Sequence, residues 1–219
     1  MGSVQFVNAL SRMKFDNTFN PYANRCKLYD LDDAPNRRAK LLCAILNAAV
    51  DSEIDAIWIG RDLGHRGGRR TGLALTDDHH LYAHAQRWGI SVERSTKGKV
   101  VAERTAAIIW SVLSNIQMPI FLWNVFPLHP HELNEPFSNR SHNARERRAG
   151  EELLSQLINL LEPRRLIAVG NVAEQTARRL AGRHEVIKLR HPSYGGQNLF
   201  LHQVKELYGV PDTAHEKFL

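Results

Sequence analysis

Three short segments of this chain carry side chains that could do chemistry on a bound molecule. The first is the stretch 58–76, where an apolar run passes into a loop rich in glycine and arginine that holds the carboxylate of Asp62. The second ends an apolar run at Asn124, and the third has His191 directly before a proline. An acid, an amide and a histidine are groups from which proteins build sites that bind and transform polar ligands.

The elements that must position these residues alternate between two patterns. Short apolar runs bounded by glycine, proline or charged residues predict buried strands at 54–60, 120–124, 165–170 and 185–189. Helical spacing of apolar residues predicts helices around them at 36–51, 76–88, 100–116, 143–161, 171–181 and 197–207. We therefore expect one domain, 1–219, of the three-layer α/β/α class with a central four-stranded parallel sheet.

In a sheet of this class, ligands bind at the carboxyl ends of the strands. Asp62 follows the first predicted strand, Asn124 closes the second and His191 follows the fourth. The irregular segment 126–143 is polar and rich in proline, asparagine and histidine, and a loop of that length is usually functional or mobile. The sequence thus predicts that the acid, the amide and the histidine meet at one edge of the sheet.

Each of these residues also has a purely structural interpretation. Asp62 could hydrogen-bond the backbone of its own turn, Asn124 could simply end its strand, and His191 could be a structural loop residue. The Gly-Gly-Arg-Arg segment 67–70 could be a solvated turn or a nest of backbone N–H groups that binds an anion. It matches neither the P-loop pattern nor the dinucleotide-binding pattern.

Two groups of histidines could hold a metal ion, but their spacing does not favour it. His129, His131 and Glu132 lie in a proline-rich loop, where no helix fixes a ligand geometry. His79 and His80 open a predicted surface helix. We expect no metal and no cofactor, with these histidines solvated or in contact with a base.

The composition limits the partners and the compartment. The 29 Lys and Arg residues against 23 Asp and Glu give a formal net charge of +6, which favours a polyanion such as nucleic acid. Two cysteines cannot hold an iron–sulfur cluster or a cysteine-rich zinc site, and they fit a reducing compartment, so we expect the cytoplasm. No apolar run approaches the roughly 18 to 20 residues that span a bilayer, so we expect no membrane partner.

The three segments together resemble the motifs of the uracil-DNA glycosylase superfamily. The family-one pattern Gly-Gln-Asp-Pro-Tyr-His, followed by Gly-Leu-Ala-Phe, is similar without a gap to Gly60-Arg61-Asp62-Leu63-Gly64-His65, followed by Gly72-Leu73-Ala74-Leu75. Asn124 lies where the superfamily has a strand-terminal asparagine that reads a pyrimidine. The second motif of the superfamily, His-Pro-Ser, matches His191-Pro192-Ser193.

The resemblance implies an enzyme that hydrolyses the N-glycosidic bond of uracil, and of other deaminated or modified bases, in DNA. The product is an abasic site in base-excision repair. The target base enters a pocket, where Asn124 reads its edge and His191 donates a hydrogen bond to O2 of the departing base. Asp62 stabilises the sugar cation and orients the attacking water. Other pocket residues implied by the motifs are Gly60, Arg61, Gly64, His65 and Leu75.

This chain departs from the family-one pattern at three positions. Gly64 replaces the tyrosine that crowds the pyrimidine C5 position and excludes thymine, so we expect a more open pocket that admits larger bases. Leu75 replaces the stacking phenylalanine and offers no aromatic surface. Gly195 aligns with the intercalating leucine, so either Tyr194 is the wedge or the wedge is absent.

The expected partner is DNA, single- or double-stranded, bound by a monomer. The residues expected to contact it are Ser193, Tyr194, Gly195 and Arg140, although the arginine run that begins at Arg140 could also be a solvated face. Two other functions stay open. One is a non-catalytic module of the same fold that binds damaged or single-stranded DNA, and the other is an unrelated α/β hydrolase that acts on free nucleosides or nucleotides.

Overall fold

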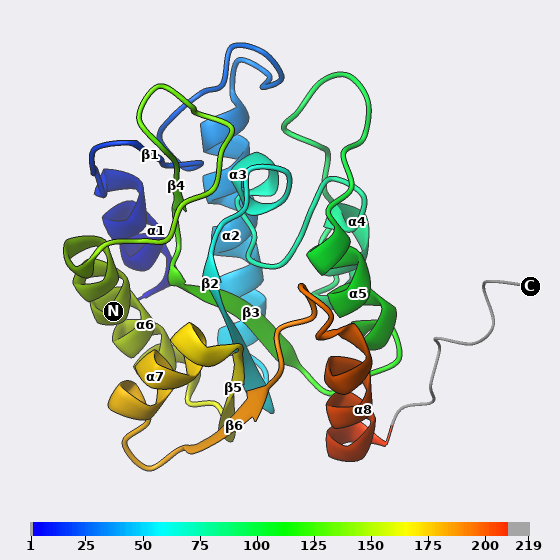
Figure 1. Cartoon of the computed structure of the whole chain (residues 1–219). Helices are drawn as coiled ribbons and strands as arrows, with labels where there is room; N and C mark the ends of the chain where they lie inside the picture. Colours follow the sequence, from blue (N-terminus) through cyan, green and yellow to red (C-terminus); the bar gives the residue numbers. More distant parts are fainter. Residues whose placement is uncertain (1, 210–219) are drawn as a thin grey trace, which may run out of the picture.

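The central sheet consists of four parallel strands in the order β3-β2-β5-β6 (Figure 1). The computed structural model describes residues 2–209. The strands of the sheet are β2 (Ala56–Asp62), β3 (Ile120–Phe126), β5 (Arg165–Val169) and β6 (Glu185–Leu189). The predicted α/β class and its four parallel strands are therefore confirmed. Strands β2 and β3 run beyond their predicted ends because their pairing continues to Asp62 opposite Phe126.

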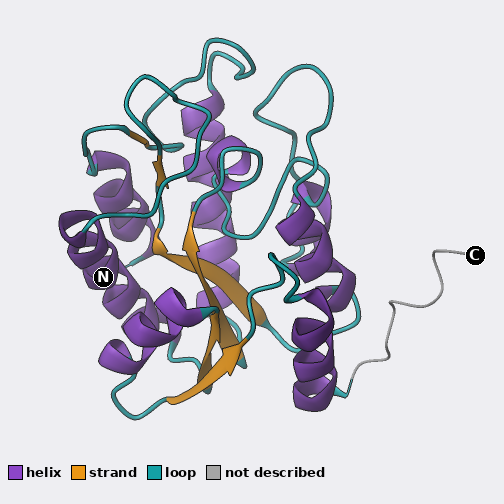
Figure 2. Cartoon of the chain, in the orientation of Figure 1, coloured by secondary structure: helices purple, strands orange, loops and turns teal. Residues whose placement is uncertain are grey.

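Side chains of the central strands alternate between two hydrophobic cores. On β2, Ile57 and Ile59 face one core, whereas Ala56 and Trp58 face the other. The first core is closed by helices α1, α2, α4, α6 and α7, and the second by α5 and α8 (Figure 2). Both faces are buried, which explains why these strands are continuous apolar runs in the sequence.

Six of the described helices match the predicted spacing with shifts at their ends, whereas the N-terminal helix α1 and the short helix α3 were not predicted. Their bounds are α1 (Ser3–Arg12), α2 (Ala34–Val50), α3 (Gly68–Thr71), α4 (Leu81–Arg87), α5 (Arg104–Leu113), α6 (Ala144–Leu161), α7 (Asn171–Leu180) and α8 (Gln197–Tyr208). Helix α4 begins five positions after the predicted cap at Thr76, whose buried hydroxyl instead donates to the carbonyl of Ala74. Among the described helices none has the length and apolar content needed to cross a bilayer.

The loops above the sheet are fixed by buried charged groups. The guanidinium of Arg38 pairs with Asp30, and that of Arg70 pairs with Asp78, with all four side chains almost fully buried. A short antiparallel ladder joins β1 (Thr18–Phe19) to β4 (His129–Pro130), which fixes the start of the long connection before α6. Removing one partner of such an ion pair leaves an uncompensated charge inside the protein, which is strongly destabilising. The two ion pairs therefore hold the loops that carry them in one position.

His129 belongs to this framework and not to a ligand site. Its Nδ1 lies 2.9 Å from Nη1 of Arg69 and accepts from it, while its Nε2 lies 2.8 Å from the carbonyl oxygen of Ser138 and donates to it. Burial, and then the charge of Arg69, lower the pKa of His129 to about 3. The neutral ring is therefore the form that the fold accommodates.

We expect the free energy of unfolding to decrease as the pH is lowered, because the folded protein holds His129 in its neutral form. Below pH 6.5 the unfolded chain takes up a proton on this ring, whereas the folded protein does not until about pH 3. The stabilising effect is complete above pH 6.5 and declines by about 1.4 kcal/mol for each pH unit below it. Urea denaturation at pH 7 and pH 5 should show a smaller decline in His129→Gln, which keeps a donor and an acceptor but does not titrate.

His79→Gln, at an exposed histidine, is the matched control. An equal decline in the wild type and in His129→Gln would contradict the assignment.

Candidate active site

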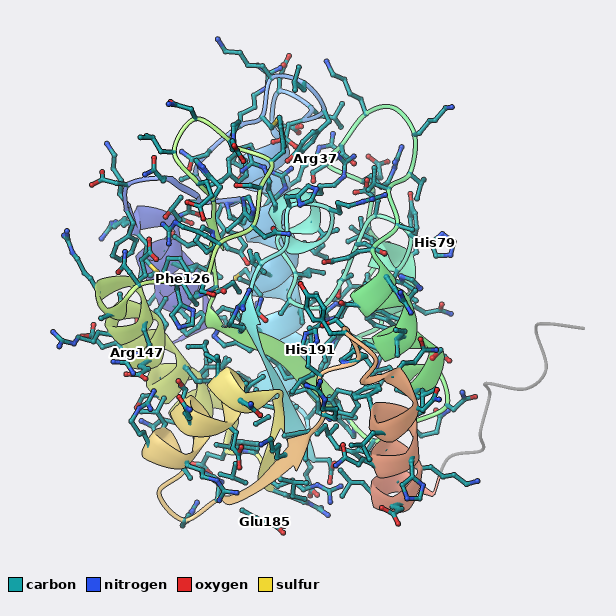
Figure 3. All side chains as sticks on the ribbon, viewed as in Figure 1. Arg37, His79, Phe126, Arg147, Glu185 and His191 are labelled. Carbon is teal, nitrogen blue, oxygen red and sulfur yellow. The ribbon has the colours of Figure 1, made fainter. Side chains whose placement is uncertain are left out.

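A cavity of about 350 Å³ opens at the carboxyl ends of the parallel strands. Its walls come from the end of β2 and the loop after it, from the residues just before and at the start of α5, from the loop before α6, from the end of β5 and from the loop after β6. The residues that line it include Asp62, Gly64, Leu75, Glu103, Asn139, Gly170, His191 and Tyr194. Figure 3 shows His191 near this end of the sheet and Glu185 at the opposite end.

Asp62 is the last residue of β2, and a guanidinium group and an imidazole ring hold its carboxylate. Nε of Arg61 donates to one oxygen at 2.7 Å, and Nδ1 of His142 contacts the other. The side chains of Asp62 and His142 are both almost fully buried, whereas that of Arg61 is half exposed. These contacts fix the orientation of the carboxylate at the cavity wall, so it does not simply cap its own turn.

His142 is a site residue that the motifs did not reveal. It comes from the long connection between β4 and α6 and lies directly before Asn143, the N-cap of α6. The capping box of Asn143 and Glu146 fixes where the helix starts and therefore where His142 lies. The only signal in the sequence was the length of this loop, which indicated a functional or mobile segment.

His191 lines the cavity as a neutral ring with a defined tautomer. The backbone N–H of Ser193 points to Nδ1 at 3.2 Å, and the hydroxyl of Ser193 lies 2.7 Å from the same nitrogen. Nδ1 is therefore the acceptor and Nε2 carries the proton. Burial, followed by the charges of Arg61 and Arg190, lowers the pKa of His191 below its ordinary value. Ser193 thus positions His191 and also borders the cavity.

Asn124 is buried behind the cavity wall with an unsatisfied amide. It lies opposite Gly60 in the β2–β3 ladder, and its side chain is 1% exposed. Within residues 2–209 neither Oδ1 nor Nδ2 has a hydrogen-bond partner. A Cβ at position 60 would collide with Oδ1 of Asn124 and would lie 3.1 Å from Cδ2 of Leu75, so the glycine is required by the close approach of this amide.

Leu75 is the residue that lines the cavity next to this amide. Its backbone is left-handed, with φ of 53°, and its carbonyl oxygen accepts from Nε1 of Trp110 at 3.1 Å. The strained conformation is therefore held from α5. Leu75 presents an aliphatic surface to the cavity.

The space beside Gly64 is occupied by another residue, Glu103. A Cβ at position 64 would lie 2.6 Å from Oε1 of Glu103, and one at Gly67 would collide with Oε2. The missing side chain therefore does not open the pocket as the sequence predicted, because a carboxyl group from the residue before α5 fills this wall.

His65 lies away from the cavity lining. Its backbone N–H donates to Oδ1 of Asn139 at 2.9 Å, and its half-buried ring lies near the ring of His129. Burial is the main cause that lowers the pKa of His65. Among the described residues no group of three His, Cys, Asp or Glu side chains is arranged to hold a metal ion.

The Gly-Arg segment at 67–70 is neither a solvated turn nor an open anion nest. It forms the short helix α3, and Arg69 and Arg70 point into the protein. Nε of Arg69 donates to the hydroxyl of Tyr29 at 2.8 Å, and its guanidinium lies 3.8 Å from the centre of the Phe19 ring. These arginines therefore stabilise the loop that carries Asp62.

Arg140 borders the cavity, but its guanidinium is committed to internal partners. It pairs with both carboxylate oxygens of the buried Glu146, at 2.6 and 2.7 Å. It also donates to backbone carbonyl oxygens of Asp16, Asn17, His131 and Ser141. A DNA phosphate would have to replace these bonds, so the structure corrects the expected DNA contact: Arg140 is a residue that holds the loop.

The loop after β6 places an exposed aromatic residue at the rim. Tyr194 is 98% exposed, and both Tyr194 and Gly195 are left-handed, with φ of 51° and 75°. The turn closes tightly, since the backbone N–H of Gly196 donates to the carbonyl oxygen of Ser193 at 3.1 Å. Tyr194 lines the cavity as well, so the rim carries a large side chain that faces solvent.

Comparison with known proteins places this chain in a family. The model of the uracil DNA glycosylase superfamily matches residues 49–207, a range that includes the cavity residues from all of its walls. The chain belongs to the uracil DNA glycosylase superfamily, whose members are hydrolytic glycosylases that act on DNA. No protein of curated function matches it in sequence.

The chain is similar to solved structures that include the following two, and the first of them supports the same fold. SMUG2 of Pedobacter heparinus has a TM-score of 0.58 and 12% sequence identity, covering 95% of this chain and 98% of that chain. UNG of Nitratifractor salsuginis has a TM-score of 0.44 and 15% identity, covering 82% and 84% of the two chains.

Arg140→Ala should destabilise the protein because it leaves the buried carboxylate of Glu146 without its cationic partner. We expect the free energy of unfolding in urea to fall by about 3 kcal/mol. Arg148→Ala, at an exposed arginine of the same segment, is the control and should change it by less than about 0.5 kcal/mol. Unchanged stability together with weaker DNA binding in Arg140→Ala would instead make Arg140 a phosphate contact.

Proposed function

We propose that this protein is a monofunctional DNA glycosylase that excises uracil and leaves an abasic site. The observation that carries the proposal is the buried amide of Asn124, which has no partner on either atom within the described residues. Such an orphaned group costs free energy unless a ligand completes its hydrogen bonds. The edge of uracil offers an acceptor at O4 and a donor at N3, which complement Nδ2 and Oδ1.

The other two groups suit the bond that must break. As the C1′–N1 bond cleaves, its electron pair passes to the base and negative charge develops on O2. The Nε2–H of His191 then stabilises this charge by a hydrogen bond. A neutral histidine suffices for this role, since it donates without having to lose a proton.

Asp62 serves the sugar side of the reaction. The sugar develops oxocarbenium character, and a carboxylate near C1′ stabilises it and orients the attacking water. Water adds its oxygen to C1′, one of its protons is released and the base anion is protonated, so the products are a free base and an abasic sugar. His142 and Arg61 hold the carboxylate in a fixed orientation, which favours attack from one direction.

The rim fits a base that has left the helix. The base must leave the stacked bases of the DNA to reach a cavity at the end of the sheet. Tyr194 is exposed at the rim, where its side chain could fill the space that the base leaves in the DNA. The exposed side chains of Arg61 and Arg190 are cations at the same rim. We assign these two arginines, together with Ser193 and Gly195, to contacts with the DNA. We also propose that the protein acts as a monomer and that it is located in the cytoplasm.

Asp62→Asn should abolish most of the excision while the protein still binds DNA. Single-turnover reactions on an end-labelled oligonucleotide with one uracil, followed by alkali, measure abasic sites as strand breaks. We expect a rate lower by about 100-fold or more, as for other positioned acid–base groups. Asp51→Asn, at an exposed residue after α2, is the matched control.

The outcomes separate the alternatives. Binding without breaks by the wild type would indicate a non-catalytic module. Cleavage of free deoxyuridine but not of the oligonucleotide would indicate a nucleosidase.

His142 should act as a positioning residue for Asp62. His142→Phe removes the contact to the carboxylate, and we expect kcat to fall by about tenfold or more with KM little changed, because orientation is lost and binding is not. His142→Asn keeps an N–H near the position of Nδ1 and should recover much of kcat. Equal losses in both variants, matched by equal losses of thermal stability, would assign His142 to the fold alone.

A further inference from the structure

The carboxyl group of Glu103 occupies the wall of the cavity at which two glycines leave room for it. Oε1 lies close to Gly64 and Oε2 close to Gly67, and a Cβ on either glycine would come too near. Glu103 is the residue before α5, and its backbone N–H donates to Oδ2 of Asp77 at 2.6 Å. The start of the helix is thereby anchored and the side chain is directed across the two glycines into the cavity wall.

This carboxyl group has no established structural task. Although Glu103 stands at the N-cap, its side chain accepts no capping hydrogen bond, and within residues 2–209 no hydrogen bond or ion pair of its carboxyl group is formed. Burial, followed by the charge of Asp77, raises the pKa of Glu103, and Arg66 opposes this shift. A partly buried acid that caps nothing and pairs with nothing is available to a ligand in the cavity.

We propose that Glu103 is the residue that determines which substituent of the base the pocket accepts. Its carboxyl group hydrogen-bonds a polar group on the base edge that faces Gly64, and it disfavours an apolar group there. This inference rests on the proposed function. The resemblance of the motif implies that Gly64 faces C5 of a bound pyrimidine, so the substituent in question is the one on C5.

The chemistry distinguishes two substituents of nearly equal size. A methyl group at C5, as in thymine, would remove water from the carboxyl group and offer no hydrogen bond in return. A hydroxymethyl group donates to the carboxylate, and it can also accept from the protonated acid. Glu103 therefore prefers the hydroxymethyl group in either protonation state. The selection depends on the polarity of the substituent, whereas an aromatic side chain at position 64 would select by its size.

The test compares matched bases within each variant. Single-turnover kcat/KM is measured on oligonucleotides that carry one uracil, one thymine or one 5-hydroxymethyluracil opposite the same base. For the wild type we expect 5-hydroxymethyluracil to exceed thymine by at least about tenfold, because a site that hydrogen-bonds a hydroxyl rejects the analogue without it. In Glu103→Leu the ratio should fall to about threefold or less, as in an apolar pocket.

Two further variants control the result. Glu103→Gln keeps a hydrogen-bonding group of the same size and should retain the preference. Glu185→Gln, at the opposite end of the sheet, should leave the ratio at the wild-type value (Figure 3). Because the ratio is taken within one variant, a general loss of activity or stability does not affect it.

The outcomes separate this inference from the proposed function. A wild type that excises no uracil overturns the proposed function. If the wild type does excise uracil, any of three results overturns the role of Glu103 alone. These are a preference that Glu103→Leu keeps, a wild type without the preference, and a failure to excise either substituted base.

Discussion

The close approach of Gly60 and Asn124 is the contact on which the site depends. The two residues lie opposite each other in neighbouring parallel strands, and the amide of Asn124 fills the space that a side chain at position 60 would need. Parallel pairing fixes the register, so Asp62 follows two residues beyond Gly60 at the same edge of the sheet. The amide and the carboxylate are thus placed by paired strands of the central sheet, whereas loops supply the groups that hold or complement them.

The connection from β4 to α6 is the second support of the site. It delivers His142 to the carboxylate of Asp62 and Asn139 to the backbone of His65. Arg140 and Glu146 join this connection to the N-terminus of α6 and to the segment before β1. The loop is therefore held in place by hydrogen bonds although most of its residues are exposed, and its His142 supports the carboxylate of Asp62.

The sequence was sufficient for the strands and for the motif residues at their ends. Strands β2, β3 and β5 are buried on both faces and so leave apolar runs, whereas the edge strand β6 is partly exposed. Asp62 ends the first of these strands, and His191 follows the last. The sequence was not sufficient for Glu103 or His142, because Glu103 reaches the cavity and His142 reaches Asp62 from elements distant in the chain, and neither belongs to a local pattern.

The same limitation explains why the consequence of Gly64 was misjudged. A glycine shows that a side chain is missing, but only the fold shows that Glu103 replaces it. The interpretation of Arg140 failed for a related reason, since an arginine in a polar loop has the same local sequence signal whether it faces solvent or a buried glutamate.

The burial of Arg38, Arg69 and Arg70 has a consequence for how the protein meets a nucleic acid. These three residues are among the 29 Lys and Arg residues of the chain, yet their guanidinium groups are inside the protein and bound to Asp30, Tyr29, His129 and Asp78. They cannot neutralise phosphates, so they displace no condensed counterions from a DNA backbone. The ionic-strength dependence of association is then governed by the exposed cations, and the count of 29 Lys and Arg residues overstates their number.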